Sequence, residues 1–377
     1  MTHRILYVVT EDWYFVSHRL PMARAAAAAG YEVHVAARFR RQRADVEQEG
    51  YVCHDLNWRR GSLSPLDSFE AIREIRALIR TCGPDIVHNV SLKPVLLGSV
   101  ASLGLPPIVV NSLTGVGSLF ITELGVNKMT RTVVQFLLGR LLQRTKSTTV
   151  VQNVDDQDFV AALGAPSERT VLIRGSGVDI ETLVPLPEPT EPVTAAYVGR
   201  MLVDKGVQNL LEAFAALKDS RIPLRLILAG DCDPENPRSL SPDQLRSETD
   251  VVGIEWLGHV TDIRDVWSRA HFAVLPSRRE GLPKSLLEAA AYGRAMVATD
   301  VPGCREIAIE GETALTVPAD DPVALAEAMA RMANDREMRA DFGRAARELV
   351  EREFSADRIG QETVDLYDRI LRHRASD

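Results

Sequence analysis

Short apolar runs of about five residues alternate along the chain with longer segments whose apolar positions recur every three or four residues. The short runs are typical of buried parallel strands, and the longer segments of helices packed on a sheet. In the first half, the expected strands are Arg4–Val9, Glu32–Ala36, Val52–Leu56, Asp85–His88, Pro107–Asn111 and Thr148–Gln152. The expected helices are Val16–Ala29, Asp67–Cys82, Leu92–Leu103 and about Lys128–Thr145. This alternation predicts a doubly wound parallel sheet.

The alternation stops at Leu183–Pro192, where four prolines prevent either element from continuing, and then resumes. The later strands are expected at Thr194–Val198, Leu224–Ala229, Ile254–Leu257, His271–Leu275 and Ala295–Thr299. The later helices are expected at Val207–Lys218, Asp262–Arg269, Lys284–Tyr292, Pro322–Asn334, Arg336–Glu351 and Ala356–His373. We therefore expect an α/β chain with one doubly wound domain at 1–182, a linker at 183–192, a second domain at 193–353 and a terminal helix in 354–377.

Composition narrows the class of protein. The 377 residues are 45% apolar and 25% charged, enough for a core in each of two domains, and the net charge of −8 argues against a general nucleic-acid binder. The four cysteines are widely spaced and no local His/Cys cluster is evident, so we expect no metal site and no disulfide framework. The N-terminus lacks a signal peptide's apolar core, and no run approaches the ~20 apolar residues of a membrane span. A cytoplasmic protein is expected.

The segment from Leu275 to Glu306 combines a strand, a charged loop and a helix. Glu280 lies in the loop and Pro283 at the predicted helix start, while Glu288 lies about six residues, or roughly 9 Å of rise, into the helix. A helix N-terminus offers backbone N–H groups and a positive dipole end, which suit a phosphate. This order fits a nucleotide sugar, with sugar hydroxyls at Glu280, the diphosphate at the helix start and ribose hydroxyls at Glu288.

Glu280 and Glu288, with seven residues between them, resemble the E-x7-E motif of the GT4-like family of retaining glycosyltransferases. The similarity continues through GLPKSLLEAAAYGRAMVATDVPGCREI, which resembles the donor-binding segment of bacterial members. The resemblance implies retention of anomeric configuration and the GT-B architecture, in which two Rossmann-like domains face a central cleft and the last helix returns to the first domain. It also implies donor contacts for Gly281, Leu282, Pro283, Lys284 and Ser285.

Two cations follow the strand that ends at Val198. Arg200 and Lys205 can hold a diphosphate and stabilise charge on the leaving UDP or GDP, and they resemble the family's donor-phosphate Arg and Lys. The alternative is a solvated loop. A pair of carboxylates would also fit a glycoside hydrolase, but a hydrolase needs no diphosphate site. The segments near the nucleotide base in the family resemble those here around Gly230, Gly258 and Val260, although the glycines can instead serve only as turns.

The N-terminal half carries the candidate acceptor residues. It lacks the glycine pair that many family members carry after the first strand, and resembles instead the D-W-F-F-x-S-H-R-L-P opening of a bacterial polysaccharide and O-antigen subset. Acceptor contacts are therefore expected for Asp12, His18 and Arg19. His88 falls near the family's active-site histidine segment and is a catalytic candidate, with a buried core histidine as the alternative.

One lysine and two basic stretches are further candidates for ligand contact in this half. Lys93 could pair with an acceptor phosphate, although a solvated lysine explains it equally well, and Arg59-Arg60-Gly61 is a weaker candidate loop. The segment Lys128–Lys146 has five cations and no acid. A basic amphipathic helix of this kind can lie on an anionic membrane, but it can also pack on the sheet with a basic outer face.

These observations lead to one hypothesis and two rivals. The hypothesis is a cytoplasmic glycosyltransferase that moves a sugar from a UDP- or GDP-sugar to a lipid-linked saccharide or another cell-surface glycan precursor. No metal cofactor is expected, because Arg200 and Lys205 would replace the cation. The first rival is a nucleotide-sugar epimerase of the same architecture, which would isomerise the donor without an acceptor. The second is a non-enzymatic nucleotide-sugar-binding protein, which would bind the donor without turnover.

Overall fold

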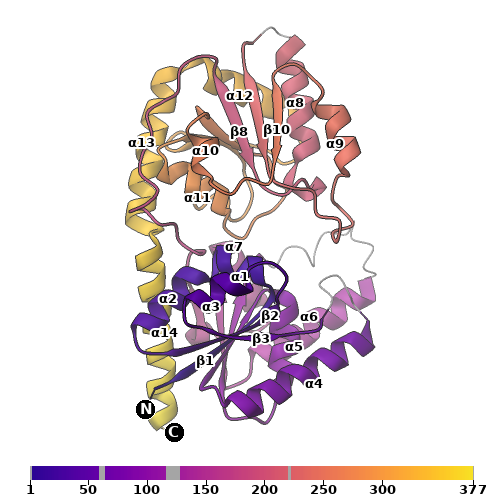
Figure 1. Ribbon diagram of the computed structural model, residues 1–377, viewed down its shortest axis with the longest axis vertical. Coiled ribbons are helices and arrows are strands. Elements are labelled where there is room, and N and C mark those ends of the chain that lie inside the picture. Colours follow the sequence, from indigo (N-terminus) through magenta and orange to yellow (C-terminus); the bar gives the residue numbers. More distant parts are fainter. Residues whose placement is uncertain (1, 59–63, 116–127, 220–221, 377) are drawn as a thin grey trace. The chain divides into compact units, whose positions relative to one another are not determined.

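The computed structural model describes residues 2–58, 64–115, 128–219 and 222–376 (Figure 1). The chain divides into two compact units. Unit 1 comprises Met1–Gly177 and Ala356–Asp377, and unit 2 comprises Val178–Ser355. The chain therefore begins in unit 1, builds the whole of unit 2 and returns to unit 1 with its last helix.

Unit 1 is a seven-stranded parallel sheet with the strand order β3-β2-β1-β4-β5-β6-β7. Its strands are β1 (Arg4–Glu11), β2 (Glu32–Arg38), β3 (Val52–Asp55), β4 (Ile86–Val90), β5 (Ile108–Leu113), β6 (Ser147–Val151) and β7 (Thr170–Leu172). Its helices are α1 (Asp12–His18), α2 (Leu20–Ala28), α3 (Arg43–Gln48), α4 (Pro65–Cys82), α5 (Leu92–Ala101), α6 (Lys128–Leu142), α7 (Val154–Ala162) and α14 (Ala356–Ser376), with a 3-10 turn η3 (Ser167–Arg169).

The last helix is part of the core of unit 1. Ile359, Leu366 and Tyr367 of α14 are buried in the same apolar cluster as residues of β1, and α14 lies alongside α2 (Figure 1). The hydroxyl of Tyr367 lies 2.9 Å from that of Tyr7 on β1. Burial of several large side chains at 1.5–3 kcal/mol each makes this helix essential to the stability of unit 1.

The helix expected at Val16–Ala29 is two helices in the structure. Arg19 separates α1 from α2 with φ −126° and ψ −16°, outside the helical region, and Pro21 lies in the first turn of α2. Proline has no backbone N–H to continue the helical hydrogen bonds of α1. The break places the buried Arg19 between α1 and α2.

Unit 2 is a six-stranded parallel sheet with the order β10-β9-β8-β11-β12-β13. Its strands are β8 (Thr194–Val198), β9 (Arg225–Ala229), β10 (Ile254–Gly258), β11 (Phe272–Leu275), β12 (Ala295–Thr299) and β13 (Ala314–Val317). Its helices are α8 (Val207–Asp219), α9 (Pro242–Thr249), α10 (Arg264–Trp267), α11 (Lys284–Ala291), α12 (Pro322–Asn334) and α13 (Arg336–Glu353), with a 3-10 turn η4 (Val203–Lys205).

The proline-dense stretch 183–192, expected as a linker, lies within unit 2. Leu186 donates its N–H to the carbonyl of Tyr292 at 3.1 Å, and Arg294 donates to the carbonyl of Leu186 at 3.1 Å. These hydrogen bonds attach the stretch to the end of α11. The chain passes between the units at 177–178 and 355–356 instead, close to the residues expected from sequence at 182 and 354.

Two strands of the structure, β7 and β13, were not expected from the sequence. They have three and four residues, too short for a clear apolar period. The residues Arg59-Arg60-Gly61 lie outside the described part of the chain. Among the described helices, none is long and apolar enough to span a bilayer.

Candidate active site

The candidate donor residues of unit 2 follow two neighbouring strands. Arg200 and Lys205 follow β8, and Glu280 follows β11. β8 and β11 are adjacent at the point where the strand order of this sheet reverses. In open parallel α/β sheets, ligands bind at the carboxyl edge beside such a point.

The structure brings Lys205 and Glu280 together. Lys205 Nζ lies 2.5 Å from Glu280 Oε1, and the hydroxyl of Ser277 donates to the same oxygen at 2.7 Å. The Glu280 side chain is only 8% exposed. A buried carboxylate with two donors is held in one orientation, with its second oxygen left for another partner.

Two glycines hold the Glu280 loop close to its neighbours. Gly206 has φ +72°, and a Cβ there would lie 1.9 Å from the carbonyl oxygen of Pro276. Gly303 has φ +79°, and a Cβ there would lie 2.4 Å from the carbonyl oxygen of Gly281. Both positions combine a left-handed backbone with backbone-to-backbone contact, so only glycine fits. The position of Glu280 is thus fixed by main chain on both sides.

Arg200 is held by a different acid. Its Nη1 lies 2.8 Å from Asp233 Oδ2, and its carbonyl accepts a hydrogen bond from the Tyr197 hydroxyl at 2.8 Å. The Arg200 side chain is 38% exposed, so a ligand can reach it from solvent. Asp233 was not singled out in the sequence, because nothing in its local pattern marks it as the partner of Arg200.

Helix α11 places Glu288 behind the loop. Lys284 Nζ lies 3.5 Å from Glu288 Oε1, one turn earlier on the helix. Burial raises the pKa of Glu288 above its ordinary value, although Lys284 opposes the shift. The helix begins at Lys284 after Pro283, and no side chain within the described residues caps it. Its first N–H groups can therefore serve an anion.

The other donor candidates lie around the same edge. Gly230 follows β9 and donates its N–H to the carbonyl of Gly258 at 2.7 Å. A Cβ on Gly230 would lie 2.0 Å from the Gly199 carbonyl oxygen, so packing by itself accounts for this glycine. Leu282 is buried in the core of unit 2, whereas Val260, Gly281 and Ser285 are half-buried.

In unit 1, His88 lies in a buried network. Its Nδ1 is 2.5 Å from the Tyr367 hydroxyl and its Nε2 is 2.6 Å from the Ser112 hydroxyl. Burial, with a smaller effect of the Arg19 charge, holds the pKa of His88 well below its ordinary value. Both ring nitrogens are engaged in a neutral ring, so a catalytic role would require one of these bonds to break.

Asp12 is engaged by the main chain. Its Oδ2 accepts the N–H groups of Arg40, Arg41 and Gln42 at 2.7, 2.8 and 2.9 Å. Burial alone would raise the pKa of Asp12, but hydrogen bonds from these amides and that of Trp13 bring it below its ordinary value. Asp12 thus anchors the loop after β2, and contact with an acceptor would cost some of these bonds.

His18 and Lys93 are more accessible than Asp12. The His18 ring stacks on Tyr14 with centroids 4.4 Å apart, and its Nδ1 lies 2.6 Å from the Ser17 hydroxyl. Lys93 is half-buried in the first turn of α5, and its Nζ lies 5.9 Å from the centroid of the Trp58 ring. Burial lowers the pKa of Lys93. The structure therefore places Lys93 against an aromatic face instead of in open solvent.

Arg19 is a buried cation without an acid. It is 2% exposed, its Nη1 donates to the His18 carbonyl at 3.3 Å, and its Nε has no hydrogen-bond partner. Within the described residues, no carboxylate forms an ion pair with it. A buried charge of this kind costs several kcal/mol unless something compensates it.

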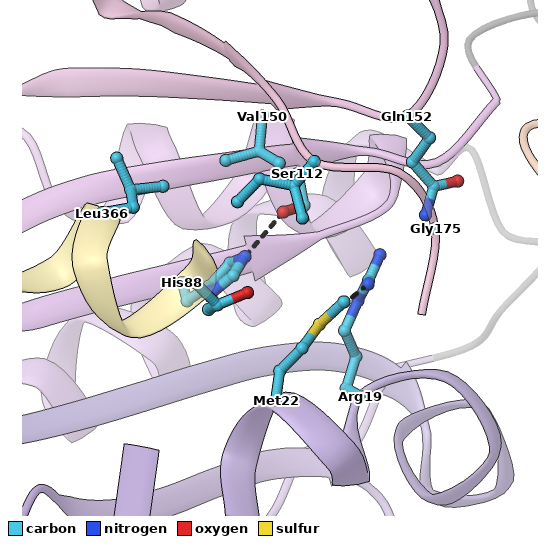
Figure 2. A pocket seen from close by; sticks show the side chains of 10 residues that line it. Arg19, Met22, His88, Ser112, Val150, Gln152, Gly175 and Leu366 are labelled. Carbon is cyan, nitrogen blue, oxygen red and sulfur yellow. Dashed lines mark hydrogen bonds between the residues drawn. The ribbon is translucent and has the colours of Figure 1, made fainter. Parts of the chain in front are cut away.

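Arg19 lines a small cavity at the carboxyl edge of the sheet. Figure 2 shows its side chain pointing towards Gln152, with His88 and Ser112 also lining the cavity. The cavity measures about 10 Å³, room for about one water or one oxygen atom of a ligand. A cation, a hydroxyl and an amide around such a space suit an anionic oxygen.

The structure brings together three residues of unit 1 that no local motif of the sequence links. His34, His54 and Cys82 each have one potential ligand atom within 4.8 Å of the others. These residues are 20 and 28 positions apart in the chain, so no local spacing marks them.

Comparisons with known proteins cover most of the chain. A family model described as "Glycosyl transferase 4-like" matches residues 4–152, and one described as "Glycosyl transferases group 1" matches residues 192–335. The chain is 26% identical over 385 aligned positions to EpsD of Bacillus subtilis (strain 168), covering 97% of both chains.

A second relative and a solved structure extend the comparison. The chain is 25% identical over 332 positions, 83% of its length and 85% of the relative's, to the N,N'-diacetylbacillosaminyl-diphospho-undecaprenol alpha-1,3-N-acetylgalactosaminyltransferase of Campylobacter jejuni subsp. jejuni serotype O:2. Its fold is similar to that of Anabaena Alr3699/HepE, crystallised with UDP and glucose, with a TM-score of 0.77 at 16% identity over 97% of this chain and 99% of that one.

Proposed function

Because the chain belongs to the GT4-like glycosyltransferases of GT-B fold, and is thus a glycosyltransferase, we propose that it moves a sugar from a UDP- or GDP-sugar to a lipid-linked saccharide or another cell-surface glycan precursor. We propose further that the transfer retains the anomeric configuration. The single observation that carries the proposal is the Lys205–Glu280 pair at the carboxyl ends of β8 and β11.

In this proposal, the donor diphosphate lies between the two cations and the start of α11. Lys205 and Arg200 stabilise the negative charge that grows on the leaving nucleotide as the glycosidic bond breaks. Lys205 is already ordered by Glu280, so little reorganisation is needed when a second anion approaches. The two cations take the place of a metal ion, and no cofactor is required.

Glu280 and Glu288 contact different parts of the donor. Glu280 has one oxygen held by Lys205 and Ser277, and its other oxygen accepts hydrogen bonds from sugar hydroxyls. Glu288 lies further along α11, where its carboxylate accepts bonds from the ribose hydroxyls. Backbone groups near Gly258 and Val260 contact the base. Donor binding also compensates the burial of the Glu288 charge.

On the acceptor side, we propose that Arg19 contacts an acidic oxygen of the acceptor, such as one of a lipid-linked diphosphate. The relative from Campylobacter jejuni is named for an acceptor of this kind. The buried, unpaired guanidinium supports the proposal, because an anionic oxygen would supply the missing partner. His18 and Lys93 are further candidates for the acceptor's polar groups.

We propose that α6 brings the enzyme to the inner face of the cell membrane. Met129, Val133 and Phe136 of this helix are 73%, 59% and 67% exposed. Lys128, Arg131 and Arg140 lie on the same helix, with the Arg140 guanidinium 5.7 Å from the Phe136 ring centroid. Exposed apolar side chains beside cations suit an anionic lipid surface.

A donor screen tests the enzymatic proposal. UDP- and GDP-hexoses are each incubated with the protein, with and without a polyprenyl-diphosphate-linked sugar, and released nucleotide and product are followed. Acceptor-dependent nucleotide release from one donor is the expected result, and NMR of the product reports the anomeric configuration. Isomerised donor without acceptor would identify an epimerase instead. Tight donor binding with no turnover of any acceptor would identify a binding protein.

A further inference from the structure

A cluster of two histidines and one cysteine lies in unit 1, on elements that carry none of the residues of the candidate active site. His34 is on β2, His54 on the edge strand β3, and Cys82 is the last residue of α4. His34 Nδ1 lies 2.9 Å from His54 Nε2, and Cys82 Sγ lies 3.6 Å from the same His54 nitrogen. His34 and Cys82 are 6% and 9% exposed.

From this geometry we infer that His34, His54 and Cys82 form a binding site for a divalent metal ion of the zinc class. Tetrahedral zinc with Zn–N of about 2.0–2.1 Å and Zn–S of about 2.3 Å separates two nitrogens by about 3.3 Å, and a nitrogen from a sulfur by about 3.6 Å. The Cys82–His54 distance already has the second value. The two histidine nitrogens need to open by only about 0.4 Å to reach the first.

The side chain behind His34 supports this inference. The other ring nitrogen of His34, Nε2, lies 2.8 Å from Glu32 Oε1. An ionised carboxylate accepts the N–H there, which leaves the lone pair of Nδ1 directed at His54 and Cys82. Metal-bound histidines characteristically donate their second nitrogen to a carboxylate in this way. Glu32 is itself held by Arg4 at 2.7 Å.

In the metal-free protein, a single hydrogen bond links the rings of His34 and His54. The rings are nearly parallel, with 14° between their planes, and a His54 N–H donating to His34 satisfies both. A metal ion binds a thiolate and a neutral imidazole, so metal binding would release the thiol proton of Cys82 and move the His54 proton to Nδ1, with solvent in the fourth position.

The bound metal would tie the edge of the sheet to a helix. β3 is the edge strand, with four residues, and Cys82 ends α4. Metal cross-links of this kind stabilise the folded chain, because the unfolded chain does not offer the same site.

Zinc titration of the full-length protein, after treatment with a chelator, tests the inference. We expect one equivalent of Zn²⁺ per chain, measured against a chromophoric competitor, and a melting temperature raised by about 5–10 °C at a hundredfold excess over Kd. Cys82→Ser and His54→Asn should each weaken binding at least tenfold, and Glu32→Gln roughly tenfold. Cys53→Ser is the matched control, because Cys53 precedes His54 on β3 and faces the other side of the sheet.

Two results would overturn the inference. One is a wild-type protein that takes up no Zn²⁺, and the other is a Cys53→Ser variant that loses as much affinity as Cys82→Ser. If a variant does not fold, cysteine alkylation of the wild-type protein still tests the site. Zn²⁺ should protect Cys82 from alkylation but leave Cys53 unprotected, and equal labelling of Cys82 with and without Zn²⁺ would also reject the site.

Discussion

The candidate site residues of the two units differ in how their charges are paired. In unit 2, cations and acids of the candidate site are paired with each other, as Lys205 is with Glu280 and Lys284 with Glu288. In unit 1, Asp12 and His88 are fully engaged by their own chain, while Arg19 is buried with no acid paired to it. A paired site is electrostatically complete before a ligand arrives, whereas an unpaired cation is stabilised by the ligand itself. Substitutions in the two units should therefore differ in how they affect activity and the melting temperature.

Removing Lys205 should have the largest effect. Lys205→Ala loses a charge-assisted contact to the leaving diphosphate, worth about 1.5–3 kcal/mol, and turnover should fall ten- to a hundredfold, or towards a thousandfold if charge stabilisation dominates. The melting temperature should fall by several degrees, because the buried Glu280 carboxylate loses its cation and keeps only the Ser277 hydroxyl on the same oxygen. Steady-state kinetics with saturating donor measures the loss.

The exposed cation Lys218 on α8 supplies the control for that experiment. Lys218→Ala should retain full turnover and the same melting temperature. A folded Lys205→Ala enzyme with wild-type turnover would show that the Lys205–Glu280 pair is structural, and the paired site of unit 2 would then lose its proposed role.

The second largest effect is expected for membrane binding, which we assign to unit 1 alone. The double substitution Phe136→Ser/Arg140→Glu removes an apolar side chain and reverses a cation on α6. At about 1 kcal/mol per cation and 1.5–3 kcal/mol for a buried phenylalanine, partitioning onto acidic vesicles should drop at least thirtyfold. Low-salt sedimentation with phosphatidylserine vesicles measures it. Val323→Ser/Arg331→Glu on α12 of unit 2, also exposed, should change nothing; an equal loss from both would remove the distinction between units.

Arg19→Met should weaken acceptor use by roughly ten- to thirtyfold, the loss of one charge-assisted hydrogen bond of about 1.5–2 kcal/mol, and leave the KM for donor unchanged. The melting temperature should stay the same or rise, because a buried cation without an acid is replaced by an apolar side chain of similar length. Kinetics with varied acceptor and a thermal melt give both values. Arg24→Met, an exposed arginine on α2, is the control; an unchanged acceptor KM in Arg19→Met would end the acceptor assignment.

The smallest effect is expected for Glu288→Gln. Donor affinity should fall several-fold, as ribose loses a charged acceptor. Because the folded pKa of Glu288 is raised above its unfolded value, the ionised carboxylate costs the native state free energy above the folded pKa, and this cost disappears as pH falls through it. Glu288→Gln should therefore melt slightly higher than wild type at pH 7, with the difference shrinking in acid. The exposed Glu327→Gln should not show this pattern, and calorimetry with unchanged donor affinity would exclude a ribose contact.

Much of the fold followed from local pattern. Apolar runs predicted the sheets because buried parallel strands are rich in apolar residues. The sequence placed Lys205 and Glu280 separately after strands of unit 2, and the structure adds that their side chains are in contact. The strands β7 and β13 were not predicted, because three or four residues are too few to show a periodic apolar pattern. The break at Arg19 was not predicted, because the helical pattern of apolar residues continues across it.

The partners of site residues were harder to predict. Asp233 reaches Arg200 from the loop after β9, and the His34–His54–Cys82 cluster depends on how β2, β3 and the end of α4 are placed. No spacing in the sequence reports such contacts, because they arise from tertiary packing. His88 shows the same limit, since a histidine inside a strand looks alike whether it faces a ligand or, as here, a tyrosine and a serine.

The return of α14 to unit 1 has a consequence for synthesis on the ribosome. Unit 2 is complete at Ser355, while unit 1 still lacks the side chain of Tyr367, whose hydroxyl contacts both Tyr7 and His88. During synthesis, unit 1 therefore begins to form before unit 2 but is completed after it, and the apolar surface of α2 and of the sheet stays uncovered until α14 has been made. Deletion of Ala356–Asp377 would therefore destabilise unit 1 and spare unit 2.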